Sequence, residues 1–186
     1  MKSAMKIGVI GDTHIPRLSP LLPARIAQVF QGLDIILHVG DICELYVLEE
    51  FQETYTLTFA IFGEEDSPEA QAYLDETRIV RFGDRCVGMI HGHQFEEHQR
   101  RGLAGLRRLF GRGTGVASMP DFLLEQFEGK EVHAVVFGHT HQPYVKMHDG
   151  VLLFNPGAAL PGPGRRPSVG ILDVGQRSIT GGIVFL

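Results

Sequence analysis

The feature that most constrains this chain is a short apolar run over residues 6–10 that ends at Gly11 and is followed by Asp12 and His14. Such a run is typical of a buried β-strand. A strand that stops at a glycine places the next polar residues at its carboxyl end, the edge of an open α/β sheet where ligands bind. Asp12 and His14 are therefore predicted to belong to a functional site.

Apolar runs and turn residues predict the other elements. In the N-terminal part, strands and helices alternate: strands over 33–39 and 57–62, and helices over 23–32 and 44–52 and from Ser67-Pro68 onward. Further on, strands dominate, over 78–82, 85–90, 132–137, 144–148, 151–154, 169–174 and 179–186, with a helix over 121–127. This order predicts a single α/β domain over residues 1–186, built from two mixed sheets packed face to face with helices outside.

Composition excludes several classes of protein. A formal net charge of −5 argues against a nucleic-acid partner, and the two cysteines, Cys43 and Cys86, are too few for a disulfide framework. The chain begins without a signal-peptide pattern, and no apolar run is long enough to span a bilayer. We therefore expect a cytoplasmic protein with no membrane partner; the sequence leaves homo-oligomerisation open.

Residues 94–120 differ from the rest of the chain and are predicted to be a basic insertion. Arginines recur among apolar residues at helical spacing, including Arg100, Arg101, Arg107, Arg108 and Arg112 beside Leu103, Leu106 and Phe110. Three interpretations stay open: a flap that binds anions, an interface for a subunit or partner, or an amphipathic helix with a solvated basic face.

Carboxylates and imidazoles follow five predicted strands. The set comprises Asp12, His14, Asp41, Glu64, His91, His139 and His141. Asp, Glu and His together suit borderline divalent metals, and one ion needs only three or four ligands. Seven candidates therefore predict two ions about 3.5–4 Å apart that share a carboxylate. Asp41 suits that bridging position because it is a short side chain directly after a glycine.

The motifs resemble those of the calcineurin-like metallophosphoesterases, and in particular their small bacterial and archaeal phosphodiesterase branch. The resemblance covers nearly the whole chain and is carried by Asp12-Thr13-His14, Gly40-Asp41, His91-Gly92-His93, Gly138-His139-Thr140-His141 and Asn155-Pro156-Gly157. Each motif alone is weak, but their order and context are specific. Asn155 has two interpretations, a residue that orients a ligand or a capping residue of the turn.

The resemblance implies a four-layer α/β/β/α sandwich that holds two divalent ions. Asp12, His14 and His141 would hold one ion, His91 and His139 the other, and Asp41 would bridge them. Manganese is the favoured ion, and iron, nickel and zinc also fit these ligands. The implied activity is phosphoester hydrolysis, in which a metal-bridging hydroxide attacks phosphorus in line.

The chain departs from the family pattern after the third predicted strand. Relatives usually have Gly-Asn-His-Asp or Gly-Asn-Cys-Asp, whereas this chain has Gly63-Glu64-Glu65-Asp66. Glu64 stands where Asn completes the second metal site, and as a ligand it would add a negative charge. Glu65 replaces a histidine that assists the leaving group, so a proton-donating role would require a raised pKa.

The predicted function is that of a metal-dependent phosphodiesterase acting on a small anionic phosphoester. His93 is either a substrate contact or an ordinary loop residue. The alternative, from a different class, is a non-catalytic scaffold for protein–protein interaction, because a eukaryotic retromer subunit resembles this branch and keeps the fold for protein binding. The near-complete ligand set favours the enzyme.

Overall fold

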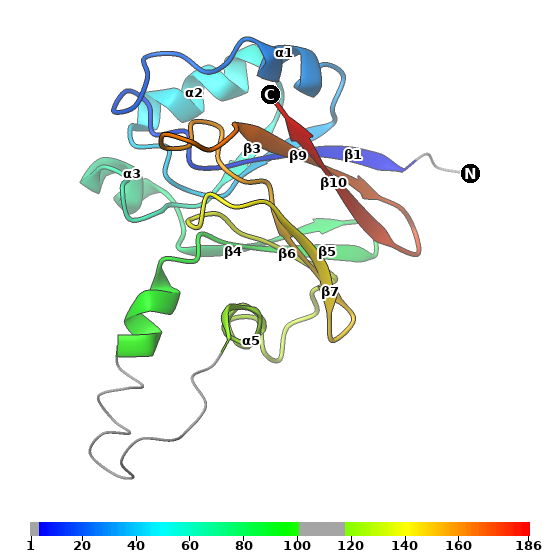
Figure 1. Cartoon of the computed structure of the whole chain (residues 1–186). Helices are drawn as coiled ribbons and strands as arrows, with labels where there is room; N and C mark the ends of the chain where they lie inside the picture. Colours follow the sequence, from blue (N-terminus) through cyan, green and yellow to red (C-terminus); the bar gives the residue numbers. More distant parts are fainter. Residues whose placement is uncertain (1–3, 101–117) are drawn as a thin grey trace.

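The computed structural model describes residues 4–100 and 118–186, and in it two five-stranded sheets pack against each other (Figure 1). The first sheet has the order β10-β9-β1-β2-β3 and the second the order β4-β5-β6-β8-β7. The strands of the first sheet are β1 (Met5–Ile10), β2 (Ile35–His38), β3 (Thr58–Ala60), β9 (Ser168–Val174) and β10 (Ile179–Phe185). Those of the second are β4 (Thr77–Phe82), β5 (Arg85–Ile90), β6 (Ala134–Val136), β7 (Tyr144–His148) and β8 (Val151–Asn155).

Both sheets are mixed, and both have parallel strands at their centre. In the first sheet β1, β2 and β3 are parallel, with Ile7 opposite Ile35, while β9 and β10 are antiparallel. In the second sheet β5, β6 and β8 are parallel and the two outer strands are antiparallel. Because parallel strands end on the same side, the segments that follow β1, β2 and β3 meet at one edge, as do those after β5 and β6.

Helices cover the outer faces of the two sheets (Figure 1). The first sheet carries α1 (Arg25–Phe30) and α2 (Leu45–Thr54), whose apolar faces form one cluster with its outer face. The second sheet carries α5 (Met119–Glu125), and a further cluster lies between the two sheets. The short helix α3 (Pro68–Tyr73) begins at the Ser67 cap, as predicted. This arrangement confirms the predicted four-layer α/β/β/α sandwich.

Two helices begin elsewhere than predicted, and their first turns explain why. α1 starts at Arg25, because the residues before it form a tighter turn in which the Ile26 amide donates to the Pro23 carbonyl. α5 starts at Met119, two residues before the predicted start, because Ser118 and Asp121 form a capping box.

The predicted insertion over 94–120 is described only at its ends. Residues 94–100 are helical, and 118–120 belong to the start of α5. The cluster of Arg101, Arg107, Arg108 and Arg112 and the helix predicted around Leu103 and Phe110 lie outside the described residues. None of the helices within the described ranges combines the length and apolar character needed to cross a bilayer.

Candidate metal centre

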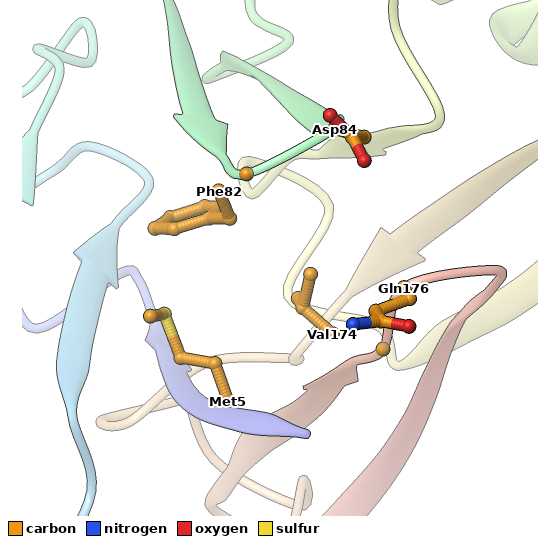
Figure 2. A pocket seen from close by; sticks show the side chains of 7 residues that line it. Met5, Phe82, Asp84, Val174 and Gln176 are labelled. Carbon is orange, nitrogen blue, oxygen red and sulfur yellow. The ribbon is translucent and has the colours of Figure 1, made fainter. Parts of the chain in front are cut away.

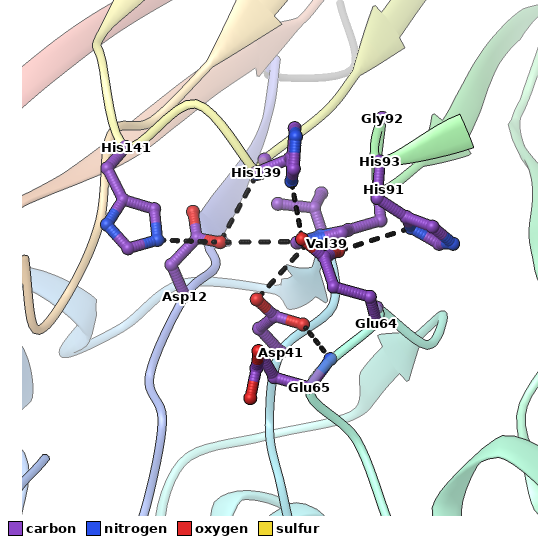
Figure 3. Close-up of polar contacts among 12 residues, drawn as sticks. Asp12, Val39, Asp41, Glu64, Glu65, His91, Gly92, His93, His139 and His141 are labelled. Carbon is purple, nitrogen blue, oxygen red and sulfur yellow. Dashed lines mark hydrogen bonds and ion pairs between the residues drawn. The ribbon is translucent and has the colours of Figure 1, made fainter. Parts of the chain in front are cut away.

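The side chains predicted at strand ends converge at one edge of the sandwich, where the two sheets meet (Figure 3). The residues after β1, β2 and β3 come from the first sheet, and those after β5 and β6 come from the second. They form two groups of potential ligand atoms, in each of which all atoms lie within 4.8 Å of one another. One group is Asp12, His14, Asp41 and His141; the other is Glu64, His91 and His139.

Backbone hydrogen bonds between the strand-end loops fix these side chains. The Asp12 amide donates to the Gly40 carbonyl at 3.1 Å, and the amides of Thr13 and His14 both donate to the Asp41 carbonyl. The Gly138 amide donates to the His91 carbonyl at 2.9 Å, which ties the two loops of the second sheet together. The His139 amide donates to Oδ1 of Asp12 at 3.2 Å and so joins the loops of the two sheets.

Two glycines are required by the close approach of these loops. Gly40 has a φ of +97°, and a Cβ there would lie 2.6 Å from Nδ1 of His91. A Cβ at Gly63 would overlap the carboxylate of Asp41 and the His91 ring. The glycines that end the second and third strands therefore make room for the candidate ligands.

Donor distances in the first group are close to those of a coordination sphere. Nε2 of His14 lies 3.2 Å from Nε2 of His141 and 3.7 Å from Oδ2 of Asp41. Nε2 of His141 lies 3.5 Å from Oδ1 of Asp12. Two donors each about 2.1 Å from one ion lie roughly 3.0–3.4 Å apart, so this group needs only a small contraction to hold a cation.

His91 occupies the centre of the second group. Its Nδ1 donates to the Val39 carbonyl at 2.6 Å, which directs Nε2 into the site. That Nε2 lies 3.0 Å from Glu64 and 3.4 Å from Asp41, yet it is buried and has no hydrogen bond of good geometry. A buried ring nitrogen among carboxylate oxygens favours a positive charge at this point, supplied either by a proton or by a metal ion.

Asp41 contacts both groups through one oxygen. Its Oδ1 accepts a hydrogen bond from the Glu65 amide at 2.9 Å, while its Oδ2 faces His14 at 3.7 Å and His91 at 3.4 Å. Burial would raise the pKa of Asp41, but the His91 ring and the Glu65 amide together hold it below its ordinary value. A charged carboxylate that faces histidines of both groups is compatible with the predicted bridging role, which stays a prediction.

The acidic side chains stabilise positive charge on the histidines of the second group. Glu64 lies 2.7 Å from Nδ1 of His139 and raises the pKa of that ring. Burial opposes protonation of His91, but Asp41 and Glu64 raise its pKa well above the ordinary value. The site favours a cation at this point, and a metal ion would replace these protons.

Burial is the main cause of the pKa shifts of Asp12 and His141. Burial raises the pKa of the Asp12 carboxyl to about 7, and its Oδ2 is a buried atom with no hydrogen-bond partner. Burial and the neighbouring His14 lower the pKa of His141 to about 4, so this ring is neutral near pH 7 and has a lone pair to offer. The orphaned Asp12 oxygen and the neutral imidazole fit a metal centre.

Asn155 performs both of the roles left open by the sequence. Its Nδ2 donates to the Gly138 carbonyl at 2.7 Å and contacts the Thr140 hydroxyl at 3.2 Å, which fixes the turn that presents His139 and His141. Its Oδ1 accepts from the Gly157 amide at 2.8 Å and so caps its own turn.

His93 and Glu65 lie at the rim of the site. Nδ1 of His93 is 3.4 Å from Glu64, and the side chain is partly exposed, so its substrate contact stays a prediction. Glu65 forms an ion pair with Arg17. The proposed general-acid role of Glu65 stays a prediction.

Sequence reasoning missed three polar residues beside the candidate ligands. Glu96 reaches to 3.4 Å from Nε2 of His139, Thr13 contacts Nε2 of His38 at 3.1 Å, and Arg165 donates to the Thr140 carbonyl at 2.8 Å. Thr13 stands within the Asp12-Thr13-His14 motif, and Arg165 stands in a glycine-rich turn after the Asn-Pro-Gly motif, whereas Glu96 has no distinctive local signal.

A pocket of about 380 Å³ lies at the opposite end of the sandwich (Figure 2). It is lined by Met5 at the start of β1, by the β4–β5 turn at 82–84 and by the β9–β10 turn at 174–176. The candidate metal ligands follow the other ends of β1 and β5, so this pocket is separate from them.

Comparison with known proteins agrees with the geometry. The family model of the calcineurin-like phosphoesterase superfamily domain matches residues 5–177. A probable metallophosphoesterase of Methanothermobacter thermautotrophicus is 30% identical over 97% of this chain and 92% of its own length. A phosphodiesterase of Methanocaldococcus jannaschii is 23% identical over 93% and 95% of the two chains.

The fold also matches solved structures. Vps29 of Chaetomium thermophilum superposes with a TM-score of 0.74 at 17% identity, over 98% of this chain and 96% of that one. This likeness concerns the fold alone, whereas the family model and the archaeal relatives match in sequence. The chain belongs to the calcineurin-like phosphoesterase superfamily.

Proposed function

We propose that this protein is a metal-dependent phosphodiesterase that holds two divalent ions. The first ion would be held by Asp12, His14 and His141, the second by Glu64, His91 and His139, with Asp41 shared between them. Manganese is the favoured ion, and iron, nickel and zinc suit the same donors. The protein would act in the cytoplasm on a small anionic phosphoester.

The observation that carries this proposal is the pair of ligand groups that share one edge of the sandwich. The buried Nε2 of His91 and Oδ2 of Asp12 have no hydrogen-bond partner, although each sits among polar atoms. Leaving such atoms unsatisfied costs roughly 1–3 kcal/mol each, and coordination would remove that cost. The donor set is the one that borderline divalent metals prefer.

Bound divalent ions would supply Lewis acidity and lower the pKa of a water ligand toward neutrality. The residues of the chain prepare the site for this. The Val39 carbonyl sets the tautomer of His91, the Glu65 amide orients Asp41, and Asn155 holds the turn that carries His139. These contacts fix the donors before substrate arrives, which reduces the reorganisation needed during reaction.

The choice of a phosphodiester rests on the archaeal relative whose name is phosphodiesterase. A diester carries one negative charge, whereas a monoester carries up to two near neutral pH. The site already contains the carboxylates of Asp12, Asp41 and Glu64. With two divalent ions bound, these carboxylates leave only a small net positive charge, which suits a singly charged diester.

Hydrolysis of bis-p-nitrophenyl phosphate tests the proposal. Metal-stripped protein should be inactive, and Mn²⁺ should restore turnover. Asp41→Ala should abolish this turnover, while Asp173→Ala, which removes an exposed carboxylate of β9, should leave it unchanged. Absence of turnover with Mn²⁺, Fe²⁺, Ni²⁺ and Zn²⁺ would contradict the proposal and favour the non-catalytic scaffold.

A further inference from the structure

Arg165 lies on a loop that is anchored directly to the candidate metal centre. The loop between β8 and β9 contains the buried Ala158 and Ala159 near its start. The Ala159 amide donates to the Gly11 carbonyl at 3.0 Å, and the Leu160 amide donates to the Asp12 carbonyl at 3.2 Å. The Ser168 amide closes the loop by donating to the Ala158 carbonyl at 2.9 Å. The base of the loop is therefore fixed against the strand end that carries Asp12.

The guanidinium of Arg165 is attached to the turn that carries a histidine of each ligand group. Its Nη1 donates to the Thr140 carbonyl at 2.8 Å. Thr140 separates His139, which belongs to the second group, from His141, which belongs to the first. The turn itself is fixed by Asn155, so Arg165 is attached to a rigid part of the site.

Most of the hydrogen-bonding capacity of Arg165 remains available. A guanidinium has five N–H donors, and the contact with Thr140 uses one of them. Within residues 4–100 and 118–186, Arg165 forms no salt bridge with a carboxylate, and its side chain is exposed. A cation with free donors beside a site for phosphoryl chemistry suits an anionic oxygen ligand.

The neighbouring arginines differ from Arg165 in their surroundings. Arg17, at the other rim of the site, is paired with Glu65. The guanidinium of Arg166 lies 5.0 Å from the centre of the Phe185 ring, which belongs to β10. Arg166 has the same charge and also lies in an exposed part of the loop, and it therefore serves as a matched control.

We propose that Arg165 binds a non-bridging oxygen of the substrate phosphoryl group and is the anion-recognising side chain of this site. This inference rests on the proposed function, because the phosphoryl group has to lie at the ligand groups for Arg165 to reach it. The rigid loop base and the contact with Thr140 place the guanidinium in advance, so binding would cost little side-chain entropy.

Binding of inorganic phosphate to the full chain, measured by calorimetry with Mn²⁺ present, tests the inference. Arg165→Met should weaken phosphate binding by about 10- to 100-fold, as expected for loss of a hydrogen bond between charged groups. The phosphate affinity of Arg165→Lys should lie between those of the parent and Arg165→Met, because lysine keeps the positive charge but lacks the planar, two-pronged donor geometry of the guanidinium. Arg166→Met should stay within about twofold of the parent.

Three readouts separate this role from a structural one. Arg165→Met should bind the same number of Mn²⁺ ions and melt at the same temperature as Arg166→Met. Its KM for bis-p-nitrophenyl phosphate should rise more than its kcat falls. If Arg165 only fastens the loop, melting temperature and Mn²⁺ affinity would change while phosphate affinity would not, and this result would overturn the inference.

Failure of the inference can be distinguished from failure of the proposed function. A parent that binds Mn²⁺ and hydrolyses the diester, with equal phosphate affinity in all three variants, would refute only the role of Arg165. A parent that neither binds Mn²⁺ nor turns over substrate would refute the proposed function. The role of Arg165 is refuted if Arg165→Met binds phosphate as tightly as the parent does. It is also refuted if the parent does not bind phosphate.

Discussion

Single residues of the candidate site have backbone conformations that most side chains avoid. φ is +52° at Asp12, +56° at Asp41, +63° at His139 and +55° at His141. Asp and His tolerate this left-handed region better than most residues, at a cost of order 1–3 kcal/mol each. Each of these residues turns the chain at a strand end. The hydrogen bonds between the loops stabilise the strained turns and keep the side chains directed into one site.

At the residue scale, Glu64 is the departure from the family pattern with the clearest test. Glu64→Asn keeps an oxygen donor near His91 and His139 but removes a negative charge. We expect turnover at saturating Mn²⁺ to be equal or higher, because a less anionic ligand leaves the ions stronger Lewis acids. Mn²⁺ should bind more weakly to this variant.

Steady-state kinetics over a Mn²⁺ titration would measure both effects of Glu64→Asn. Glu64→Gln, which has the original length without the charge, separates the contribution of length from that of charge. If Glu64→Asn were inactive although the parent was active, the site would depend on the glutamate itself.

His38 should make stability depend on pH. It is fully buried against Thr13, and burial lowers its pKa to about 3. The unfolded chain takes up a proton on this ring below about pH 6.5, whereas the folded chain resists it, so stability falls as pH decreases from 6.5 toward 3. Between pH 7 and pH 5 this group should account for a loss of about 2 kcal/mol.

Urea unfolding at these two pH values would measure the effect of His38. His38→Gln should lower stability at pH 7 but show a smaller decrease on acidification, by about 2 kcal/mol. His98→Gln, at an exposed histidine, should keep the decrease of the parent. An equal decrease in His38→Gln and the parent would assign acid sensitivity to other groups.

At the scale of elements, α5 shows how a cap decides where a helix begins. The Ser118 hydroxyl accepts from the Asp121 amide at 3.3 Å, and the Asp121 carboxylate accepts from the Ser118 amide. Asp121 also contacts His148 of β7 at 3.2 Å, so the cap joins the helix to the second sheet. Phe122 and Leu123 on this helix are buried against that sheet.

Removal of this cap should destabilise the protein modestly. Ser118→Ala should cost about 1 kcal/mol and lower the melting temperature by about 2–4 °C. Ser178→Ala, in the exposed turn between β9 and β10, should leave the melting temperature unchanged. A shift of similar size in both variants would contradict the capping role.

At the scale of the whole molecule, the site joins the two sheets. Asp12, Asp41 and Glu64 follow strands of the first sheet, whereas His91 and His139 follow strands of the second. A bound ion would therefore link the two layers at one end of the sandwich. Its binding energy adds to the stability of the fold, because the unfolded chain lacks the arranged donors.

Metal loading should consequently raise the melting temperature. At a free Mn²⁺ concentration of 100 times Kd, one site adds about 2.7 kcal/mol, which corresponds to about 5–10 °C for a chain of this size. Calorimetric melting with Mn²⁺ and with a chelator would measure the shift. Asp41→Ala should lose most of it, and an undiminished shift in that variant would place the stabilising ion elsewhere.

The sequence by itself determined the succession of strands along the chain and which residues stand at strand ends. Apolar runs that end in glycine or in a polar residue indicate both the strand and the place where it stops. Asp12, Asp41, His91 and His139 are therefore identifiable from the sequence alone. Their residue types in turn imply a metal site. These features are local in the chain, and local patterns are what a single sequence displays.

Only the tertiary structure decided how distant residues pair. Arg165 meets the Thr140 carbonyl, Arg17 pairs with Glu65, and Glu96 approaches His139, although each pair is far apart in sequence. Such contacts depend on how the two sheets pack and how the loops fold back over their edge. No local pattern specifies that geometry, because one arginine or glutamate has the same local signal whether it faces solvent or a site.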